Sequence, residues 1–319
     1  MLEYFLFVLG FGLLIKGAQL LIKGSSSIAK KHRISDIVIG LTIVSLGTSL
    51  PELIINLFAS FNNNSSIAIG NIFGSNVANI LLILGLSAMF NPLPIRKNTL
   101  YSEIPFAMIA TLLAGFLANA TFSGTEAGLF FSRGDGFILI FFFILFMMYI
   151  LKLAKDDKSL MEEVSEPEIS ISKSYVFIGL GIVMLFLGGE WVVKGATKIA
   201  ADIGLSKEFV GLTVVAIGTS LPELVTSVVA ARRKSIDIAV GNIIGSNIFN
   251  LLWVLGLSAS IKPLPFELIN NVDVLVMLGA IVLILPAVIL SKKHHINRLW
   301  GTVFVLMYFV YLYYLVVRG

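Results

Sequence analysis

Two acidic side chains stand out because each lies inside an otherwise apolar stretch. Glu52 lies in "IVSLGTSLPELIINLF" (43–58), and Glu223 lies in "VVAIGTSLPELVTSVV" (214–229). An ionised carboxylate in a segment of this kind is costly unless it faces a polar interior or an ion. Two neighbouring carboxylates repel each other, and a divalent cation neutralises both. The pair therefore predicts a cation site.

The residues around both glutamates are oxygen donors. Proline and glycine in each "GTSLPE" segment interrupt helical hydrogen bonding, so we expect free carbonyls at 45–48 and 216–219. Two bidentate glutamates and two carbonyls supply about six oxygens, within the range that calcium takes. A second motif, "GNIFGSNVAN" (70–79) and "GNIIGSNIFN" (241–250), adds hydroxyl and amide groups. The candidate ligands are Glu52, Glu223, Thr48, Thr219, Ser49, Ser220, Ser75, Ser246, Asn79, Asn250 and the carbonyls of Ser45 and Ala216.

A structural role competes with ligation for each polar residue. A single serine, threonine or asparagine in a membrane helix commonly pairs helices, and for Asn76 and Asn247 we expect packing or backbone contact. The glutamates have few structural uses at such positions, so they carry the prediction of ion binding. For Gln19 and Glu190 we expect snorkelling or helix pairing.

Composition indicates a polytopic membrane protein. Of 319 residues, 57% are hydrophobic and 13% are charged, whereas about a quarter are charged in soluble domains. The absence of cysteine excludes disulfides, thiolate metal sites and thiol nucleophiles. Apolar stretches of about 20 residues are long enough to span a bilayer. We expect ten spans, near 3–22, 37–60, 67–90, 100–120, 134–153, 174–196, 208–231, 238–261, 271–291 and 298–317.

The net charge of +4 reports membrane topology, because the basic residues fall between the spans. We therefore expect no nucleic acid partner. With the N-terminus outside, sixteen Lys and Arg residues fall in inner loops and six fall in outer ones. We expect both termini outside, and we expect the first span to remain in the mature protein rather than act as a cleaved signal.

The chain contains an internal repeat at an offset of 171 residues. Over residues 40–89, 27 of 50 positions are identical to their counterparts. Each half has five predicted spans, and an odd number inserts the second half upside down, as in many secondary transporters. The predicted fold is an all-α polytopic membrane protein of ten transmembrane helices in two inverted repeats. We expect a first repeat at 1–153, a cytoplasmic linker at 154–173 and a second repeat at 174–319.

The paired "GTSLPE" and "GNxxGSNxxN" motifs resemble the two alpha-repeats of the sodium/calcium exchanger family, in its compact prokaryotic or archaeal form. The resemblance spans nearly the whole chain. It implies that Glu52 and Glu223 bind calcium together with the carbonyls of Thr48 and Thr219, and that Asn79 and Asn250 complete the centre. It also implies flanking sodium sites that share these glutamates and threonines with Ser49, Ser75, Ser220, Ser246, Ser45 and Ala216. Spans 1 and 6 would slide to alternate access. Some relatives, among them potassium-dependent exchangers, carry aspartate at the position of Asn250, so a role for potassium is disfavoured.

The expected function is sodium/calcium antiport by a multi-pass protein of the cell membrane. Its partners would be calcium, sodium and the lipid bilayer, and the sequence implies no protein partner and no cofactor. A proton/calcium antiporter with the same glutamate pair is the alternative. A channel fits inverted repeats less well. An intramembrane hydrolase is disfavoured because the chain lacks HExxH, cysteine and an aspartate dyad in the spans, so we expect no enzyme.

Overall fold

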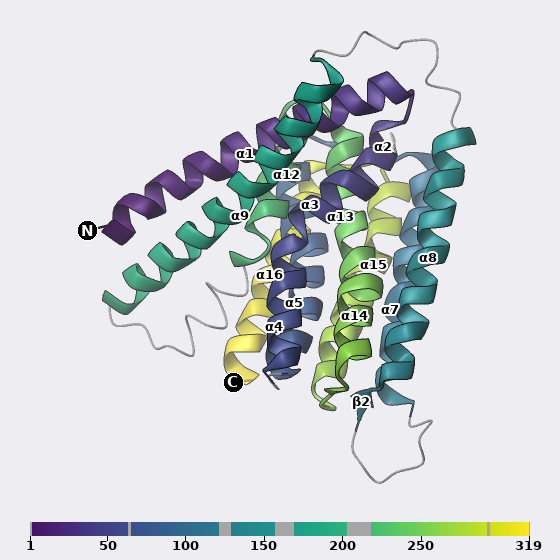
Figure 1. Ribbon diagram of the computed structural model, residues 1–319. Coiled ribbons are helices and arrows are strands. Elements are labelled where there is room, and N and C mark those ends of the chain that lie inside the picture. The colour runs from purple at the N-terminus through teal and green to yellow at the C-terminus, as the bar shows by residue number, and fades with distance from the viewer. Residues whose placement is uncertain are drawn as a thin grey trace.

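The computed structural model describes residues 2–62, 65–120, 129–156, 169–202, 218–291 and 294–318, and they form an all-helical bundle (Figure 1). Within these residues, eight helices are long and apolar enough to cross a membrane. The segments Asp36–Thr48 and Leu50–Phe61, bent by 47° at the break between them, make a ninth candidate span. The first part of the predicted span 208–231 lies outside the described residues, and its described part is α12 (Leu221–Arg232). The helices of the first repeat are α1 (Leu2–His32), α2 (Asp36–Ile39), α3 (Ser45–Thr48), α4 (Leu50–Phe61), α5 (Ser65–Val77), α6 (Gly85–Phe90), α7 (Ile104–Asn119) and α8 (Arg133–Asp156).

The second repeat begins at α9 (Ile171–Asp202) and continues after α12 with α13 (Ile236–Ile248), α14 (Leu255–Ile261), α15 (Asn270–Ile289) and α16 (Arg298–Arg318). Short π-helical segments interrupt several spans, and two of them, Ala78–Leu84 and Phe249–Val254, begin 171 residues apart. The linker prediction stays a prediction, because residues 157–168 lie outside the described part of the chain.

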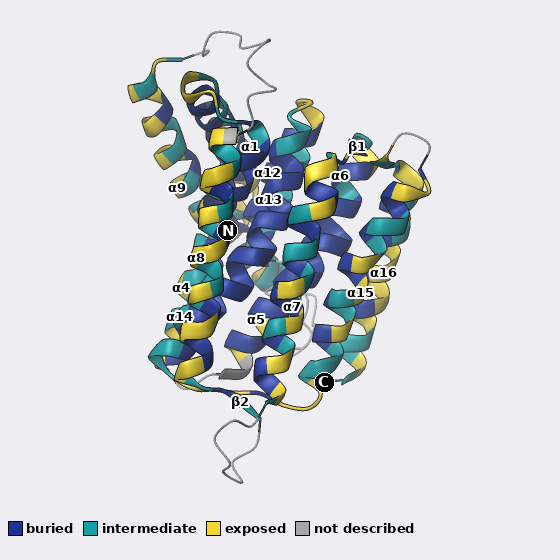
Figure 2. Cartoon of the chain, turned by 90° about the vertical axis from the view of Figure 1, so that its right-hand side faces the viewer, coloured by how far each residue is buried: buried dark blue, intermediate teal, exposed yellow. Residues whose placement is uncertain are grey.

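Four two-residue strands tie the repeats together. β1 (Leu93–Pro94) pairs with β4 (His295–Ile296), and β2 (Phe130–Phe131) pairs with β3 (Leu264–Pro265), both antiparallel. β1 and β3 are equivalent by the 171-residue offset, yet β1 lies at one end of the bundle and β2, with its partner β3, at the other (Figure 2). Equivalent segments at opposite ends are the arrangement that an inverted repeat produces.

α1 and α9 run side by side across the bundle (Figure 1). Their backbones approach closely at glycines: a Cβ on Gly10 would lie 2.9 Å from the Gly188 carbonyl oxygen, and one on Gly17 would lie 2.9 Å from that of Gly181. Small residues allow this kind of close helix packing in membranes. Gly10 corresponds to Gly181 and Gly17 to Gly188 by the repeat offset, so the contact is self-complementary.

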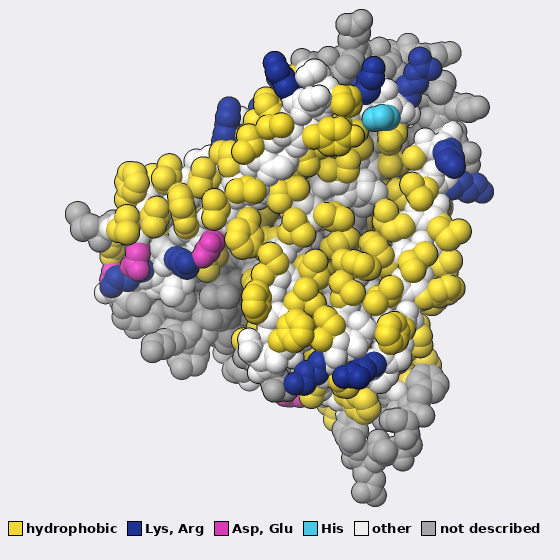
Figure 3. All heavy atoms as spheres, viewed as in Figure 1, with side chains coloured by type: hydrophobic (Ala, Val, Ile, Leu, Met, Phe, Trp, Pro, Cys, Tyr) yellow, Lys and Arg dark blue, Asp and Glu magenta, His cyan; other side chains and the backbone are white. Residues whose placement is uncertain are grey.

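The two helices with the "GNxxGSNxxN" motif form the centre of the bundle. The most apolar window of the Ile236–Ile261 span is 94% buried, whereas that of α8 is 17% buried. Figure 2 shows the same gradient from buried centre to exposed periphery. On the face in Figure 3, hydrophobic side chains cover the middle while Lys and Arg lie mainly at the two ends. A bilayer therefore surrounds the bundle, and the motif residues lie at its core.

Candidate ion-binding site

Each glutamate lies in the first turn of a helix that begins at a break. The break between α3 and α4 falls at Ser49 (φ −86°, ψ 7°), and Ser220 before α12 has nearly the same backbone (φ −86°, ψ 5°). Pro51 and Pro222 follow at the helix starts, where proline is tolerated because its missing N–H would have no helical partner. The Ser45 carbonyl accepts the Ser49 N–H at 3.0 Å, and the Thr48 hydroxyl lies 3.3 Å from the same oxygen. At least one of its two lone pairs is therefore used, and the second is free when the Thr48 proton points elsewhere.

The two carboxylates are buried and poorly satisfied. Glu52 is 1% exposed and Glu223 is 0% exposed. Ser49 Oγ donates to Glu223 Oε1 at 2.9 Å across the repeat boundary. Among the described residues, neither oxygen of Glu52 nor Oε2 of Glu223 has a hydrogen-bond partner. Buried acceptors without donors are unfavourable, and a cation would satisfy all three oxygens.

The second motif brings further buried oxygens from both repeats. Asn250 Nδ2 donates to Ser75 Oγ at 3.2 Å, and Asn79 Nδ2 donates to Asn247 Oδ1 at 3.3 Å. Asn247 thus pairs with a candidate ligand across the repeat boundary, beyond the packing role we expected for it. Within the described residues, the buried oxygens without a partner include Asn79 Oδ1, Asn250 Oδ1, Ser220 Oγ and Ser246 Oγ.

Eleven of the twelve predicted ligands lie in the described part of the chain. Ten are buried and Thr219 is partly buried. The cross-repeat hydrogen bonds bring Ser49 to Glu223 and Ser75 to Asn250. The twelfth, Ala216, lies outside the described residues. No described cluster contains three or more His, Cys, Asp or Glu residues, so the described acidic charge of this site is two carboxylates.

Two asparagines that the sequence analysis passed over hold the site threonines. Thr48 Oγ1 donates to Asn242 Oδ1 at 3.0 Å, and Thr219 Oγ1 donates to Asn71 Oδ1 at 3.2 Å. Each asparagine comes from the repeat opposite to its threonine. When the hydroxyl proton points to the asparagine, the lone pairs of the threonine oxygen are left for a cation. Both repeats carry an asparagine at this position of an apolar helix, and that repetition could have predicted a role for Asn71 and Asn242.

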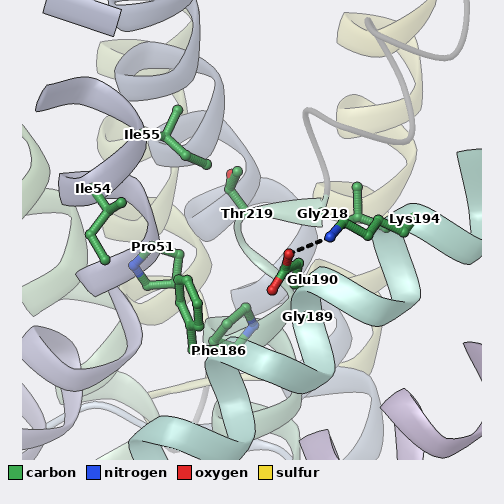
Figure 4. A pocket seen from close by; sticks show the side chains of 11 residues that line it. Pro51, Ile54, Ile55, Phe186, Gly189, Glu190, Lys194, Gly218 and Thr219 are labelled. Carbon is green, nitrogen blue, oxygen red and sulfur yellow. Dashed lines mark hydrogen bonds and ion pairs between the residues drawn. The ribbon is translucent and has the colours of Figure 1, made fainter. Parts of the chain in front are cut away.

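A cavity of about 310 Å³ reaches the site from one side. Pro51, Pro222 and Thr219 line it, and α9 contributes Phe186 and the ion pair of Glu190 with Lys194 (Figure 4). The Glu190–Lys194 pair, at 2.5 Å, joins two residues one turn apart on α9, so the helix pairing or snorkelling expected for Glu190 stays a prediction. The cavity lies between α4, which begins the turn with Glu52, and α9, one of the two helices expected to slide.

Known proteins share both the sequence and the fold. The family model "Sodium/calcium exchanger protein" matches residues 2–152 and 173–317. The inner membrane protein YrbG of Escherichia coli is 36% identical, covering 81% of this chain and 79% of YrbG. The sodium/calcium exchanger MaX1 of Methanosarcina acetivorans is 32% identical over 97% of both chains.

Among solved structures, the sodium-calcium exchanger NCX_Mj, soaked with sodium and calcium, superimposes with a TM-score of 0.80. The two sequences are 33% identical over 97% of each chain. The ten-helix transporter fold expected from the repeat is thereby confirmed. With its paired motifs, its bundle and its family match covering most of its length, this chain is a member of the sodium/calcium exchanger family of membrane transporters.

Proposed function

We propose that the chain is an antiporter that exchanges sodium for calcium by alternating access. The observation that carries this proposal is the pair of buried glutamates, one from each inverted repeat, with three oxygens that lack a described donor. Inverted-repeat transporters bind their ions at the repeat interface near the bilayer midplane. The names of MaX1 and NCX_Mj, both sodium/calcium exchangers, support the same ions here.

The proposed calcium ligands are Glu52 and Glu223 with the carbonyls of Thr48 and Thr219. The proposed sodium sites share the glutamates and add hydroxyls and carbonyls from both repeats, and we propose that Asn79 and Asn250 complete the central region. These additional ligands are Ser49, Ser75, Ser220, Ser246, Ser45 and Ala216. Because sodium and calcium need the same two carboxylates, one displaces the other, and this competition couples the two fluxes.

Charge makes the exchange electrogenic. Two carboxylates with one calcium ion are neutral, whereas the same pair with about three sodium ions carries one positive charge. An empty pair would carry about two negative charges through an apolar barrier, so only loaded states cross. A membrane potential that is negative inside therefore favours sodium entry and calcium exit, at about 2.3 kcal/mol per charge per 100 mV.

We further propose that the protein resides in the cell membrane with both termini outside and that its two repeats, 1–153 and 174–319, are joined by a cytoplasmic linker. In that orientation the cavity beside Pro51 opens outward, because α4 runs toward the outer side in the predicted topology. The name of YrbG as an inner membrane protein supports this location.

The competing hypothesis is proton/calcium exchange, because unpartnered carboxylate oxygens also accept protons. Purified protein in sealed liposomes should take up calcium-45 when a sodium gradient is imposed at equal pH. A proton gradient at equal sodium should give no more uptake than empty liposomes. Uptake driven by the proton gradient alone would overturn sodium coupling, and uptake driven only by a potassium gradient would overturn the interpretation of Asn250.

A further inference from the structure

A second hollow lies between α1, α6 and α12, at the other side of α12 from the candidate ion site. Its volume is about 560 Å³. Phe11 and Ile15 of α1, Phe90 of α6 and Leu224 of α12 contribute apolar walls. Phe11 is 41% and Ile15 is 47% exposed, so the hollow is a groove that opens on the lipid-facing surface of the bundle.

The length of the groove along α12 is close to the thickness of one bilayer leaflet. It begins at Leu224, next to the site glutamate Glu223, and ends at Arg232 and Arg233. Eight residues of helix separate Leu224 from Arg232, a rise of about 12 Å. Half of the hydrocarbon core of a bilayer is about 15 Å. The apolar walls can therefore contact an acyl chain from the midplane to the headgroup level, where the two arginines lie.

Both arginines are available to an anion. Arg232 and Arg233 are exposed, and the Arg232 guanidinium lies 5.7 Å from the centre of the Phe90 ring, which holds it over the mouth of the groove. In the described part of the chain, no carboxylate forms an ion pair with either side chain. Guanidinium groups bind phosphate oxygens in a bidentate manner.

The equivalent end of α4 shows that these charges are not a general feature of the repeat. Phe61 and Asn62 occupy the positions equivalent to Arg232 and Arg233. On that half of the molecule, the basic residue in the cavity beside α4 is Lys194, which Glu190 already pairs. Within the described residues, paired arginines at the end of the helix therefore occur in α12 and not at the equivalent positions of α4.

We propose that this groove binds an anionic phospholipid of the cytoplasmic leaflet, with one acyl chain against α1 and α12 and its phosphate on Arg232 and Arg233. Basic pockets between transmembrane helices on the cytoplasmic side bind anionic headgroups in this manner. The proposal concerns lipid binding alone, so it holds or fails independently of the transported ions.

Native mass spectrometry of the purified full chain tests the proposal with phosphatidylglycerol and phosphatidylcholine of identical acyl chains in competition. The wild type should bind phosphatidylglycerol about thirtyfold more tightly, since each of the two arginines near the surface contributes about fivefold. The double substitution Arg232→Gln and Arg233→Gln should bind both lipids equally. Val228→Trp, which fills the groove but keeps the arginines, should lose tight binding of both lipids.

The matched control is the double substitution Lys152→Gln and Lys155→Gln. It removes two charges from the C-terminal end of α8, at the same predicted membrane face and away from the groove. This variant should keep the wild-type preference. Equal binding of the two lipids by the wild type would overturn the proposal. So would an equal loss of preference in both charge variants, because the cations would then act only as a diffuse surface charge.

Discussion

The two copies of "GTSLPE" have the same sequence but different hydrogen bonds. Glu223 accepts a hydrogen bond from Ser49 of the other repeat. Among the described residues, neither oxygen of Glu52 has a donor, and the hydroxyl of Ser220, the counterpart of Ser49, has no partner. Identical ligands therefore lie in unequal surroundings. An inverted repeat makes the two halves of a site equivalent in composition, and the packing around them makes them different.

The two repeats also differ in the asparagines that hydrogen-bond to the site threonines. In the second repeat, Asn242 Nδ2 donates to Ser227 Oγ at 2.9 Å. The first repeat has Asn56 in place of Ser227, and the Asn56 amide donates instead to the Glu52 carbonyl of its own helix at 2.8 Å. Asn71 Nδ2 is therefore left without a partner among the described residues. In the described part of the chain, the Asn242 side chain thus makes two hydrogen bonds, to Thr48 and Ser227, whereas the Asn71 side chain makes one, to Thr219.

The largest effect should come from removing either carboxylate. Glu52→Gln and Glu223→Gln should each lower sodium-dependent calcium-45 uptake about a hundredfold or more, because one remaining carboxylate leaves a buried divalent ion uncompensated. The effects should be equal despite the unequal hydrogen bonds, since calcium needs both charges.

Glu190→Gln is the matched control for the carboxylate variants, because it removes a glutamate from the cavity that reaches the site and should keep most of the uptake. All three variants should elute as folded protein of wild-type size. Near wild-type flux in Glu52→Gln or Glu223→Gln would remove that residue from the proposed site.

An intermediate effect should follow from widening the contact between α1 and α9. Gly10→Ala places a methyl group 2.9 Å from the Gly188 carbonyl oxygen, and overpacking of this kind costs about 1–3 kcal/mol. The thermal unfolding midpoint should fall by about 3–6 °C. Gly181→Ala, the equivalent change in the second repeat, should give a similar shift because its Cβ would lie 2.9 Å from the Gly17 carbonyl oxygen.

Gly12→Ala and Gly179→Ala serve as controls on the same two helices, because a Cβ at either position meets nothing within 4 Å. Neither should lower the unfolding midpoint, because alanine favours a helix over glycine and meets no neighbour there. If all four substitutions lowered the midpoint alike, the close contact would not explain the fall, and the self-complementary interface would lose its support.

The smallest effect, and the one that most sharpens the comparison of the repeats, should come from the asparagines. Asn242→Leu removes two hydrogen bonds and should raise the sodium concentration for half-maximal exchange about fivefold. Asn71→Leu removes one and should raise it about twofold. The half-saturating calcium concentration should change less, because the carboxylates dominate the binding of a divalent ion.

Asn91→Leu, which removes an asparagine hydrogen bond to the Ala231 carbonyl away from the site, should leave sodium dependence unchanged. A larger effect of Asn71→Leu than of Asn242→Leu would contradict the proposed inequality. Parallel changes in sodium and calcium dependence would indicate a purely structural role for both asparagines.

Much of the fold was predictable because it depends on long-range periodic features. Apolar length predicted the helices, and the 171-residue offset predicted the inverted repeat that β1 and β3 display at opposite ends. The hydrogen-bond partners of the site were not predictable. An asparagine in an apolar helix signals a buried polar contact, but only the packed positions of α5 and α13 show that Asn71 and Asn242 meet threonines of the other repeat.

Local backbone effects were predictable only in part. The sequence "GTSLPE" predicted an interrupted helix, and the structure shows the break at Ser49. The prediction of free carbonyls from residue 45 onward did not anticipate that Ser45 accepts the Ser49 N–H. This bond depends on the exact turn geometry, which the proline alone does not determine.

The strand pairs β1·β4 and β2·β3 also constrain how the protein is made. Each pair joins a loop of the first repeat to a loop of the second, and glycines of α1 and α9 likewise pack against each other. During synthesis the whole first repeat precedes these partners: α9 follows it directly, β3 precedes α15, and β4 is made only just before α16. The contacts between the repeats can therefore form only in stages, and the β1·β4 pair comes last.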